Sequence, residues 1–548
     1  MLPAIVSILP HFVFGLADCI IVGSCFSTKK TMELEFPQRP VSESVEFYVK
    51  FASALLFVVL VAAWSKKRKG RLPPGPFPLP IIGNLHMLGA LPHRALAALS
   101  MKHGPLMSLR LGSVLTLVVS SPEVAREFLK THDQLFANKP PSAAAKHLSF
   151  NFSDFGFTSY SPYWRQLRKL CSLELLSPRR LDYFRFIREE EVSTMIRSIV
   201  NSDDSRPLNI NQTLASLGTA IICRMAFGRK YSDQDLRGFS SMVRESFFLL
   251  GSFNIGDYIP YLDWMDLQGL NRRMKKLQKT QEHLLEKVID EHIARNDPNV
   301  THDLVDILLA ASADKDREFQ ISRDGIKGVL FDMLLGGSDT AAIVIEWAMS
   351  EALRNPPVMK KLQDELERVV GLGRMVCESD LPRLVYLQAV VKETLRLYAP
   401  GSFLTRYLSA QSCNVLGYEI PHNTLVLVNI WAIGRNPMSW QDAGNFRPER
   451  FMEKVGSEID ANGDQNFGFV SFGAGRRRCP GQQLGTLVAE FGLAQLLHCF
   501  NWRLPLDDIN RENEELDMTE MFCGILLRKA RELSAISTPR LECIAHLK

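Results

Sequence analysis

The sequence predicts one large, mainly α-helical domain with small β-sheets, which follows an N-terminal membrane anchor. The 548 residues are 46% hydrophobic, enough for a large buried core. After a proline-rich stretch at residues 71–85, no repeat, low-complexity tract or Gly/Ser linker divides the chain. Apolar residues recur at helical spacing over four long segments, residues 271–294, 325–354, 357–370 and 381–397. The β-like runs are short, at residues 106–121 and 424–434.

The predicted membrane anchor covers residues 47–65. Its core, FASALLFVVLVAAW at residues 51–64, carries no charge, and with the residues before it the segment is long enough to span a bilayer core of about 30 Å. The basic run KKRKGR follows at residues 66–71. The positive-inside rule places this run, and everything after it, in the cytosol. A buried core helix is the alternative, but such a helix is seldom followed by a basic block.

Residues 1–46 form an N-terminal extension. Its apolar part, from Leu2 to Phe26, is interrupted by prolines, a histidine and an aspartate. It fits a second membrane span, a cleaved signal or an extension outside the working protein. Met32 offers an alternative start. The sequence leaves these alternatives open.

Residues 66–85 combine the basic stop-transfer run with a hinge. Five prolines fall within eight positions of RLPPGPFPLPIIGNL, residues 71–85, which excludes a helix. We expect a stiff, extended connection to the main domain, which covers residues 86–548.

Charge and cysteine content give no sign of a nucleic-acid-binding protein or of a zinc-finger protein. The formal net charge is only +4, which gives no reason to expect binding to nucleic acid. The ten cysteines form no C-x-x-C pair and no zinc-finger grouping with histidine. This usage is typical of a reducing compartment with mostly inert thiols. A cysteine with a chemical role must therefore act alone.

The apolar helical segment at residues 325–354 carries an unusual centre. Gly336 and Gly337 each lower helix stability by about 1 kcal/mol relative to alanine, and the polar Ser338, Asp339 and Thr340 follow them. Glycines let another group approach the backbone, and a distorted helix centre often marks a functional site. A simple helix–helix contact is the alternative.

Glu393 and Arg396 are spaced i, i+3 on a predicted apolar helix, so their side chains share one face. Arg450 in the later run FRPERF could complete a buried Glu–Arg–Arg network. The same spacing occurs at residues 351/354 and 365/368, where we expect solvated surface pairs.

The run FVSFGAGRRRCPG, residues 469–481, places one cysteine at the start of a predicted helix. The helix N-terminus and the neighbouring Arg477 and Arg478 predict a stabilised thiolate at Cys479, the form that binds metal. Gly473 and Gly475 would allow a hairpin whose backbone lies flat against a planar ligand. Arg478 stands where a dinucleotide loop needs its third glycine, which excludes that motif.

Together these residues resemble the cytochrome P450 family of haem-thiolate monooxygenases, over roughly residues 72–540. The loop matches the family's F-x-x-G-x-R-x-C-x-G in every specified position, and residues 336–340 resemble its oxygen-activating motif. Glu393/Arg396 resemble its E-x-x-R, and YWRQLRK supplies a W-x-x-x-R pair. The proline hinge and AIGRNP, residues 432–437, are most similar to plant microsomal members of the A type.

The resemblance implies a haem b cofactor and assigns roles around it. Cys479 would be the axial iron ligand and Phe472 would pack near its sulfur. Thr340 with Asp339 would relay protons. The remaining residues fall into a haem-contacting group, Arg477, Trp164, Arg168, Gly473 and Arg406, and a structural group, Glu393, Arg396 and Arg450.

Four departures from the family pattern are visible. Ala341 replaces the usual serine or threonine after Thr340, and YAPGSF replaces the usual H-P-P-x-P. Arg406 falls one position before the family's basic propionate ligand, which leaves Tyr407 in that column. NKP, residues 138–140, replaces the more usual A/S-R-P.

The function implied is a single-pass enzyme of the endoplasmic reticulum membrane with a cytosolic catalytic domain. It would insert one oxygen atom from O2 into a small, largely apolar metabolite. The resemblance to plant members implies a role in plant secondary metabolism. The chain has no flavin or nicotinamide fingerprint, so electrons would come from NADPH through a separate NADPH-cytochrome P450 reductase. A basic strip at residues 476–478 with Arg168 and Lys169 would dock it.

Two alternatives share this fold: a non-catalytic haem or ligand-binding protein, and a reductase-independent haem rearrangement enzyme. Thr340 argues against the second, because such relatives tend to lack this threonine. The sequence determines neither the substrate nor the oligomeric state. By analogy the substrate pocket is expected along residues 143–157, 252–260, 334–337, 399–404 and 521–525.

Overall fold

The computed structural model describes residues 72–202, 206–295, 303–314, 320–408, 411–453, 467–505, 509–510 and 515–545. The chain divides into two units, Met1–Arg71 and Leu72–Lys548. The predicted extension, anchor and basic run lie outside the described residues, and the predicted domain boundaries stay predictions.

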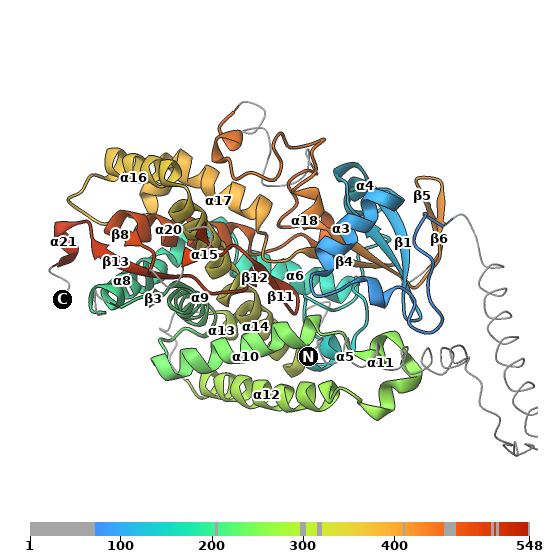
Figure 1. Ribbon diagram of the computed structural model, residues 1–548. Helices are drawn as coiled ribbons and strands as arrows, with labels where there is room; N and C mark the ends of the chain where they lie inside the picture. Colours follow the sequence, from blue (N-terminus) through green and yellow to red (C-terminus); the bar gives the residue numbers. More distant parts are fainter. Residues whose placement is uncertain are drawn as a thin grey trace, which may run out of the picture. The chain divides into compact units, whose positions relative to one another are not determined.

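Helices dominate the unit that begins at Leu72, as the sequence predicts (Figure 1). The α-helices are α3 Pro92–His103, α4 Pro122–Arg126, α5 Ala143–Leu148, α6 Pro162–Glu174, α7 Pro178–Tyr183, α8 Arg185–Val200, α9 Ile210–Phe227, α10 Asp233–Gly251, α11 Ile255–Tyr258, α12 Leu270–Ala294, α13 Leu304–Ala313, α14 Arg323–Ser338, α15 Thr340–Arg354, α16 Pro356–Val370, α17 Val385–Leu397, α18 Ile430–Ile433, α20 Gln482–Cys499 and α21 Glu542–Ala545. Short helical turns are η1 Leu85–Met87, η2 Glu127–Thr131, η3 Pro260–Met265, η4 Glu378–Arg383, η5 Pro448–Phe451 and η6 Gly475–Arg477.

The sheets are small. The largest has the order β1-β2-β7-β4, with β2 and β7 parallel and the other pairs antiparallel. Its strands are β1 Leu106–Leu111, β2 Val114–Val119, β4 Phe403–Leu408 and β7 Thr424–Asn429. A three-stranded sheet has the order β3-β13-β8, with β3 Leu208–Asn209, β8 Phe500–Arg503 and β13 Ser534–Pro539. The remaining strands form antiparallel pairs, β5 Cys413–Val415 with β6 Tyr418–Ile420, β9 Ile509–Asn510 with β10 Glu515–Leu516, and β11 Glu520–Cys523 with β12 Leu526–Lys529.

The helix predicted at residues 325–354 is the centre of the fold, but it is broken in two. Helix α14 ends at Ser338 and α15 begins at Thr340, with Asp339 between them. Both helices pack on α9, and α15 also packs on α17 and α20. This is the one helix pair of the described residues that is long and apolar enough to cross a membrane, and most of it is buried inside the protein. Its apolar faces therefore belong to the core.

Each of the two predicted β-like runs is shorter as a strand than the sequence suggests: the first is two strands and the second is a strand followed by a helix. The run at 106–121 is a hairpin of β1 and β2, which turns at Gly112 with a φ of 59°. The run at 424–434 is β7 followed by the short helix α18. Part of the proline-rich segment lies against β1, because Ser108 donates its backbone N–H to Pro74 O and its hydroxyl to Pro73 O.

Candidate active site

The segment that carries Cys479 is a tight hairpin leading into α20. The Gly473 N–H donates to Val470 O at 2.8 Å, and the Cys479 N–H donates to Phe472 O at 2.9 Å. Cys479 comes three residues before the first residue of α20, as predicted from the sequence. The hairpin therefore holds the thiol near a helix N-terminus.

The two hairpin glycines are needed for different reasons. Both have a positive φ, 73° at Gly473 and 70° at Gly475. A Cβ on Gly475 would lie 2.3 Å from Leu129 O, so this residue is pressed against the turn η2. A Cβ on Gly473 would meet the Leu404 side chain at 3.4 Å and the Arg478 Cα at 3.9 Å, which are ordinary contact distances. Of the pair, only Gly473 leaves a face of the hairpin free for a planar ligand.

The thiol itself is not stabilised as a thiolate by its protein surroundings. The Cys479 side chain is exposed on the hairpin, but desolvation by the surrounding protein raises its pKa above the ordinary value, although Arg168, Arg478 and the Gly481 N–H oppose the shift. The predicted lowering by neighbouring arginines is therefore wrong, because desolvation outweighs their charges. A bound metal cation would have to supply the missing stabilisation.

Three cations gather beside this hairpin. Arg477 donates to Ala137 O at 2.6 Å, to Phe155 O at 3.1 Å and to Thr158 O. Arg406 on β4 is almost fully buried, and donates to Ala474 O and Thr405 O, both at 3.2 Å. Lys139 lies beside Thr405, donating to its carbonyl at 3.3 Å and its hydroxyl at 3.2 Å.

These three cations lack a direct counter-charge. Among the described residues, no acceptor of Arg406, Arg477 or Lys139 is a carboxylate, and the Arg406 Nε has no partner. Burial lowers the pKa of both arginines to about 10, and burial together with Arg406 lowers the pKa of Lys139 well below its usual range. Uncompensated buried charge is unfavourable. The cluster is therefore suited to an anionic ligand with more than one carboxylate.

Trp164 and Arg168 lie on α6 next to this cluster. The Trp164 indole stacks under the Arg477 guanidinium at 4.3 Å, and its N–H donates to Phe155 O at 2.7 Å. Arg168 donates to Arg478 O. Trp164 thus fixes Arg477 and does not itself offer a free donor.

At the break between α14 and α15 the two glycines again differ. A Cβ on Gly337 would lie 2.8 Å from the Ile222 side chain of α9, so this glycine is a helix–helix contact. A Cβ on Gly336 would meet nothing within 4 Å. The Thr340 hydroxyl donates to Gly336 O at 2.9 Å. The helix break therefore presents an open position and a hydroxyl together.

Asp339 points to other partners. It is buried, forms an ion pair with Arg528 of β12, and lies 3.7 Å from the Arg244 Nε of α10. Asp339 and Thr340 are therefore neighbours in the sequence, but their side chains have separate partners in the structure.

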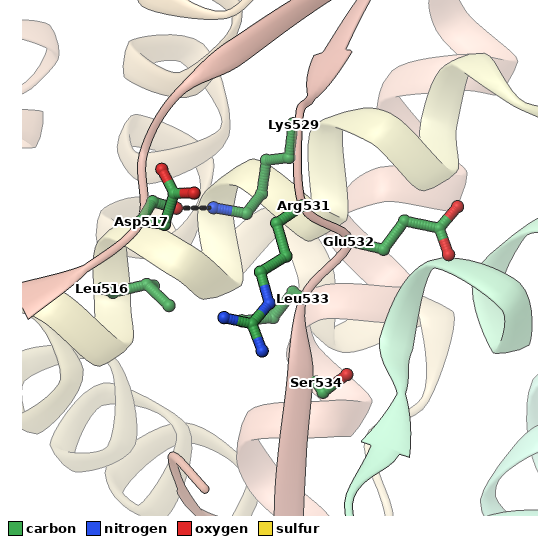
Figure 2. A pocket seen from close by; sticks show the side chains of 7 residues that line it. All are labelled: Leu516, Asp517, Lys529, Arg531, Glu532, Leu533 and Ser534. Atoms are coloured by element: carbon green, nitrogen blue, oxygen red, sulfur yellow. Dashed lines mark hydrogen bonds between the residues drawn. The ribbon is translucent and has the colours of Figure 1, made fainter. Parts of the chain in front are cut away.

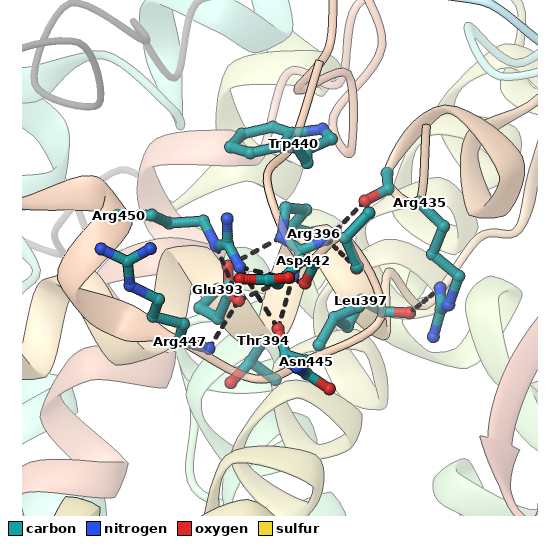
Figure 3. A network of polar contacts seen from close by, with 12 residues as sticks. Glu393, Thr394, Arg396, Leu397, Arg435, Trp440, Asp442, Asn445, Arg447 and Arg450 are labelled. Carbon is teal, nitrogen blue, oxygen red and sulfur yellow. Dashed lines mark hydrogen bonds and ion pairs between the residues drawn. The ribbon is translucent and has the colours of Figure 1, made fainter. Parts of the chain in front are cut away.

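Glu393, Arg396 and Arg450 form the buried network that the sequence predicts (Figure 3). Arg396 donates to both Glu393 oxygens at 2.7 Å, and Arg450 Nε donates to Glu393 Oε1 at 3.0 Å. The other Arg396 donors reach the carbonyls of Gly434, Ala443 and Asn445. Every charge is paired, so the network joins α17 to the segment that leads into η5.

The comparisons with known proteins agree with this arrangement. The cytochrome P450 family model matches residues 73–527. The chain belongs to the cytochrome P450 family. It is 43% identical to cytochrome P450 750A1 of Pinus taeda over 88% of this chain and 94% of that protein. It is 39% identical to flavonoid 3'-monooxygenase CYP75B137 of Crocosmia x crocosmiiflora, over 90% and 98%.

Solved structures give the same family. A zebra fish cytochrome P450 with progesterone superposes with a TM-score of 0.70 at 26% identity, over 82% of this chain and 99% of that one. This P450 is therefore a haem-dependent monooxygenase, an oxidoreductase. The two propionates of haem fit the uncompensated cation cluster of Arg406, Arg477 and Lys139.

Two site residues, Lys139 and Arg528, were not predicted from the sequence, whereas Arg406 was. Lys139 joins the cluster although NKP departs from the family motif, and Arg406 rather than Tyr407 enters it, since the Tyr407 hydroxyl bonds Asn423. Arg528 gave no signal because its partner Asp339 is remote in sequence.

A small pocket lies apart from the cation cluster and the Cys479 hairpin, none of whose residues line it (Figure 2). It is lined by Leu516, Asp517, Lys529, Arg531, Glu532, Leu533 and Ser534.

Proposed function

We propose that this P450 is a membrane-anchored haem-thiolate monooxygenase in which the Cys479 thiolate would bind the haem iron. The observation that carries the proposal is the position of the Cys479 thiol, on a hairpin that also borders the uncompensated cations Arg406 and Arg477. Haem bound there supplies the activation of O2 for insertion of one oxygen atom into the substrate.

The residues around the hairpin would bind and orient the haem. Arg406, Arg477 and Lys139 would neutralise its propionates, with Arg168 next to them. Trp164 would hold Arg477 by stacking and through their shared acceptor, Phe155 O. Phe472 would pack near the sulfur, and Gly473 would leave room for the ring.

Thr340 would hold the proton closest to the open position at Gly336. Asp339 would pass a proton on to it, as the resemblance implies, only after leaving its ion pair with Arg528 and taking up a proton from solvent. Glu393, Arg396 and Arg450 would be structural.

Electrons would come from NADPH through NADPH-cytochrome P450 reductase, an acidic partner. Supporting this, Arg165, Lys169 and Arg476 are exposed on α6 and the Cys479 hairpin. Arg477 and Arg478 of the predicted basic strip are engaged inside the protein, with backbone carbonyls and with Gln482. The docking strip would therefore be narrower than the sequence suggests.

Membrane lipid would contact the body as well as the anchor at residues 47–65. Phe77 and Ile81, which follow the anchor closely, are 74% and 76% exposed. Tyr261 and Trp264 of η3 are 86% and 81% exposed. Such large exposed apolar side chains favour a membrane surface, here that of the endoplasmic reticulum.

The substrate would be a small, largely apolar metabolite, as in plant secondary metabolism. The name of the Crocosmia relative points to a flavonoid, and the zebra fish structure holds a steroid, progesterone. Phe403 and Phe522, with ring centroids 6.3 Å apart, would form part of an apolar wall.

The carbon-monoxide difference spectrum of the reduced protein tests the haem-thiolate proposal. We expect a red-shifted Soret band in the wild type and none in Cys479→Ala. Cys377→Ala is the matched control, because Cys377 is also a free, exposed cysteine. A band that survives in Cys479→Ala would overturn the assignment. Turnover with an added reductase then tests the electron source.

A further inference from the structure

Two carboxyl groups outside the proposed catalytic residues, one buried and one partly buried, meet at one loop. Asp154, which is 1% exposed, accepts the backbone N–H groups of Phe157 and Thr158, both at 3.0 Å. Asp332 on α14 accepts the N–H groups of Phe155 and Gly156, also at 3.0 Å. The loop of residues 154–158 is therefore held through four consecutive backbone N–H groups.

The two carboxyl groups also contact each other. A Cβ on Gly156 would lie 2.9 Å from Asp332 Oδ1 and 3.2 Å from Asp154 Oδ2, so oxygens of both side chains converge on this glycine. The two side chains are thus placed to hydrogen-bond to one another. A hydrogen bond between two carboxyl groups requires a proton on one of them, because a carboxylate is only an acceptor.

Burial and the closeness of the two acids favour one proton on the pair. Burial raises the pKa of Asp154 to about 6, and burial followed by the charge of Asp154 raises the pKa of Asp332 well above its usual range. The charge of Asp154 acts on Arg477 and Lys139 at a distance only, since neither cation is hydrogen-bonded to the pair. The titratable groups that face the pair are Arg477, Lys139, Arg168, Tyr163 and Cys171.

We propose that Asp154 and Asp332 share one proton and act as positioning residues, which fasten the loop of residues 154–158 to helix α14. This loop supplies Phe155 O to both Trp164 and Arg477, and Thr158 O to Arg477. The shared proton thus influences the cation cluster indirectly, because it fixes the positions of the two backbone carbonyls that Arg477 binds. The last step rests on the proposed haem-binding role of Arg477.

The proposal predicts a loss of loop order on the alkaline side. The pKa of each acid is higher in the folded loop than in an unfolded chain, so protonation stabilises the docked loop. That stabilisation is fully present below the ordinary pKa of an aspartic acid and is lost as the pH rises through the raised pKa of the folded pair. Two ionised carboxylates would then repel each other.

Hydrogen exchange of the amides of residues 155–158, in the full-length protein in lipid nanodiscs across pH, measures the docking. In the wild type we expect exchange, corrected for its intrinsic pH dependence, to accelerate as the pH rises through the raised pKa of the folded pair. Asp332→Asn mimics the protonated acid, since its amide donates to Asp154 and its carbonyl accepts the loop N–H groups. Its exchange should stay slow at every pH, while Asp332→Leu should exchange about tenfold faster or more at every pH.

Asp324→Asn is the control, since Asp324 lies on the same helix, pairs with Lys327 and is 57% exposed at its side chain. It should keep the wild-type profile. The proposal is overturned if Asp332→Asn follows the wild-type pH profile, or if it exchanges as fast as Asp332→Leu. The carbon-monoxide spectrum of the same samples tests the haem site separately, so a missing band with a normal exchange profile would contradict only the proposed function.

Discussion

At the scale of single residues, the haem-binding role of a side chain is indicated by a buried charge that has no counter-charge in the protein. Arg406 is the clearest case, because it is almost fully buried and its Nε has no partner among the described residues. Such a cation destabilises a protein without its ligand and stabilises the bound state. Asp133, the acid that faces it, is already paired with Arg476 at 2.8 Å.

Arg406→Met tests this residue. Haem binding should weaken by about 2 kcal/mol or more, because the anionic ligand loses a desolvated partner. The haem-free protein should unfold at the same temperature or higher, because an unpaired buried charge has been removed. Haem-to-protein ratio, the rate of haem loss and thermal unfolding without haem provide the measurements.

Tyr407→Phe is the control for that substitution, since Tyr407 follows Arg406 on β4 and bonds Asn423 instead. It should retain haem like the wild type. Equal haem retention by Arg406→Met would show that Arg406 does not bind the ligand.

At the scale of elements, the break between helices α14 and α15 shapes the candidate active site. Helices α14 and α15 could form one continuous helix by composition, but Gly218 of α9 approaches so closely that a Cβ there would lie 2.2 Å from Ser338 O. This close packing accompanies the interruption at Asp339, beside the open position at Gly336.

Adjacent glycine substitutions separate packing from opening. Gly337→Ala should destabilise the protein by about 1 kcal/mol or more, because its Cβ meets Ile222 at 2.8 Å. Gly336→Ala should stabilise it by up to about 1 kcal/mol, since nothing obstructs the methyl group and alanine favours a helix. Thermal unfolding of the haem-loaded variants measures both, and the reverse order would contradict the packing described for α14.

Glu393→Gln should be among the most damaging single changes. It leaves Arg396 and Arg450 buried with an uncharged partner, which costs about 3–5 kcal/mol for a broken buried ion pair. Glu453→Gln is the control, because Glu453 pairs with the partly exposed Arg447. Denaturant unfolding should separate the two variants clearly, and a wild-type midpoint for Glu393→Gln would refute the network's structural role.

At the scale of the whole molecule, the chain after the anchor must lie on one side of the membrane if residues 47–65 span it as predicted. Asn151 begins the sequon Asn-Phe-Ser and is exposed. Asn211, in the sequon Asn-Gln-Thr, is buried between Glu346 and Arg244, so it cannot report orientation in the folded protein. A third sequon, at Asn299, lies outside the described residues.

A cytosolic body therefore predicts an unmodified Asn151 in a eukaryotic host that glycosylates secreted proteins. Treatment with an N-glycosidase should leave the mobility of the protein unchanged. A shift that disappears in Asn151→Gln would place the body in the lumen and sink the orientation inferred from KKRKGR.

Much of the site could be predicted because its signals are local. The spacing around Cys479, the polar insertion at Gly336–Thr340 and the Glu393/Arg396 pair each fall within one element. Local spacing misled at Glu351 and Glu365, predicted as surface acids. Both are buried: Glu351 bonds the Tyr398 hydroxyl and Glu365 accepts two backbone N–H groups at the start of α17.

The sequence by itself determined the helical class, the central apolar helix and the cysteine hairpin, since helical period, glycine and proline act within a few residues. Only the tertiary structure decided which charges are paired. It brought Arg406 and Lys139 together without a carboxylate, gave Asp339 to Arg528, and set Asp154 against Asp332. Burial and charge pairing depend on neighbours remote in the chain, and these determine the pKa of a group such as the Cys479 thiol.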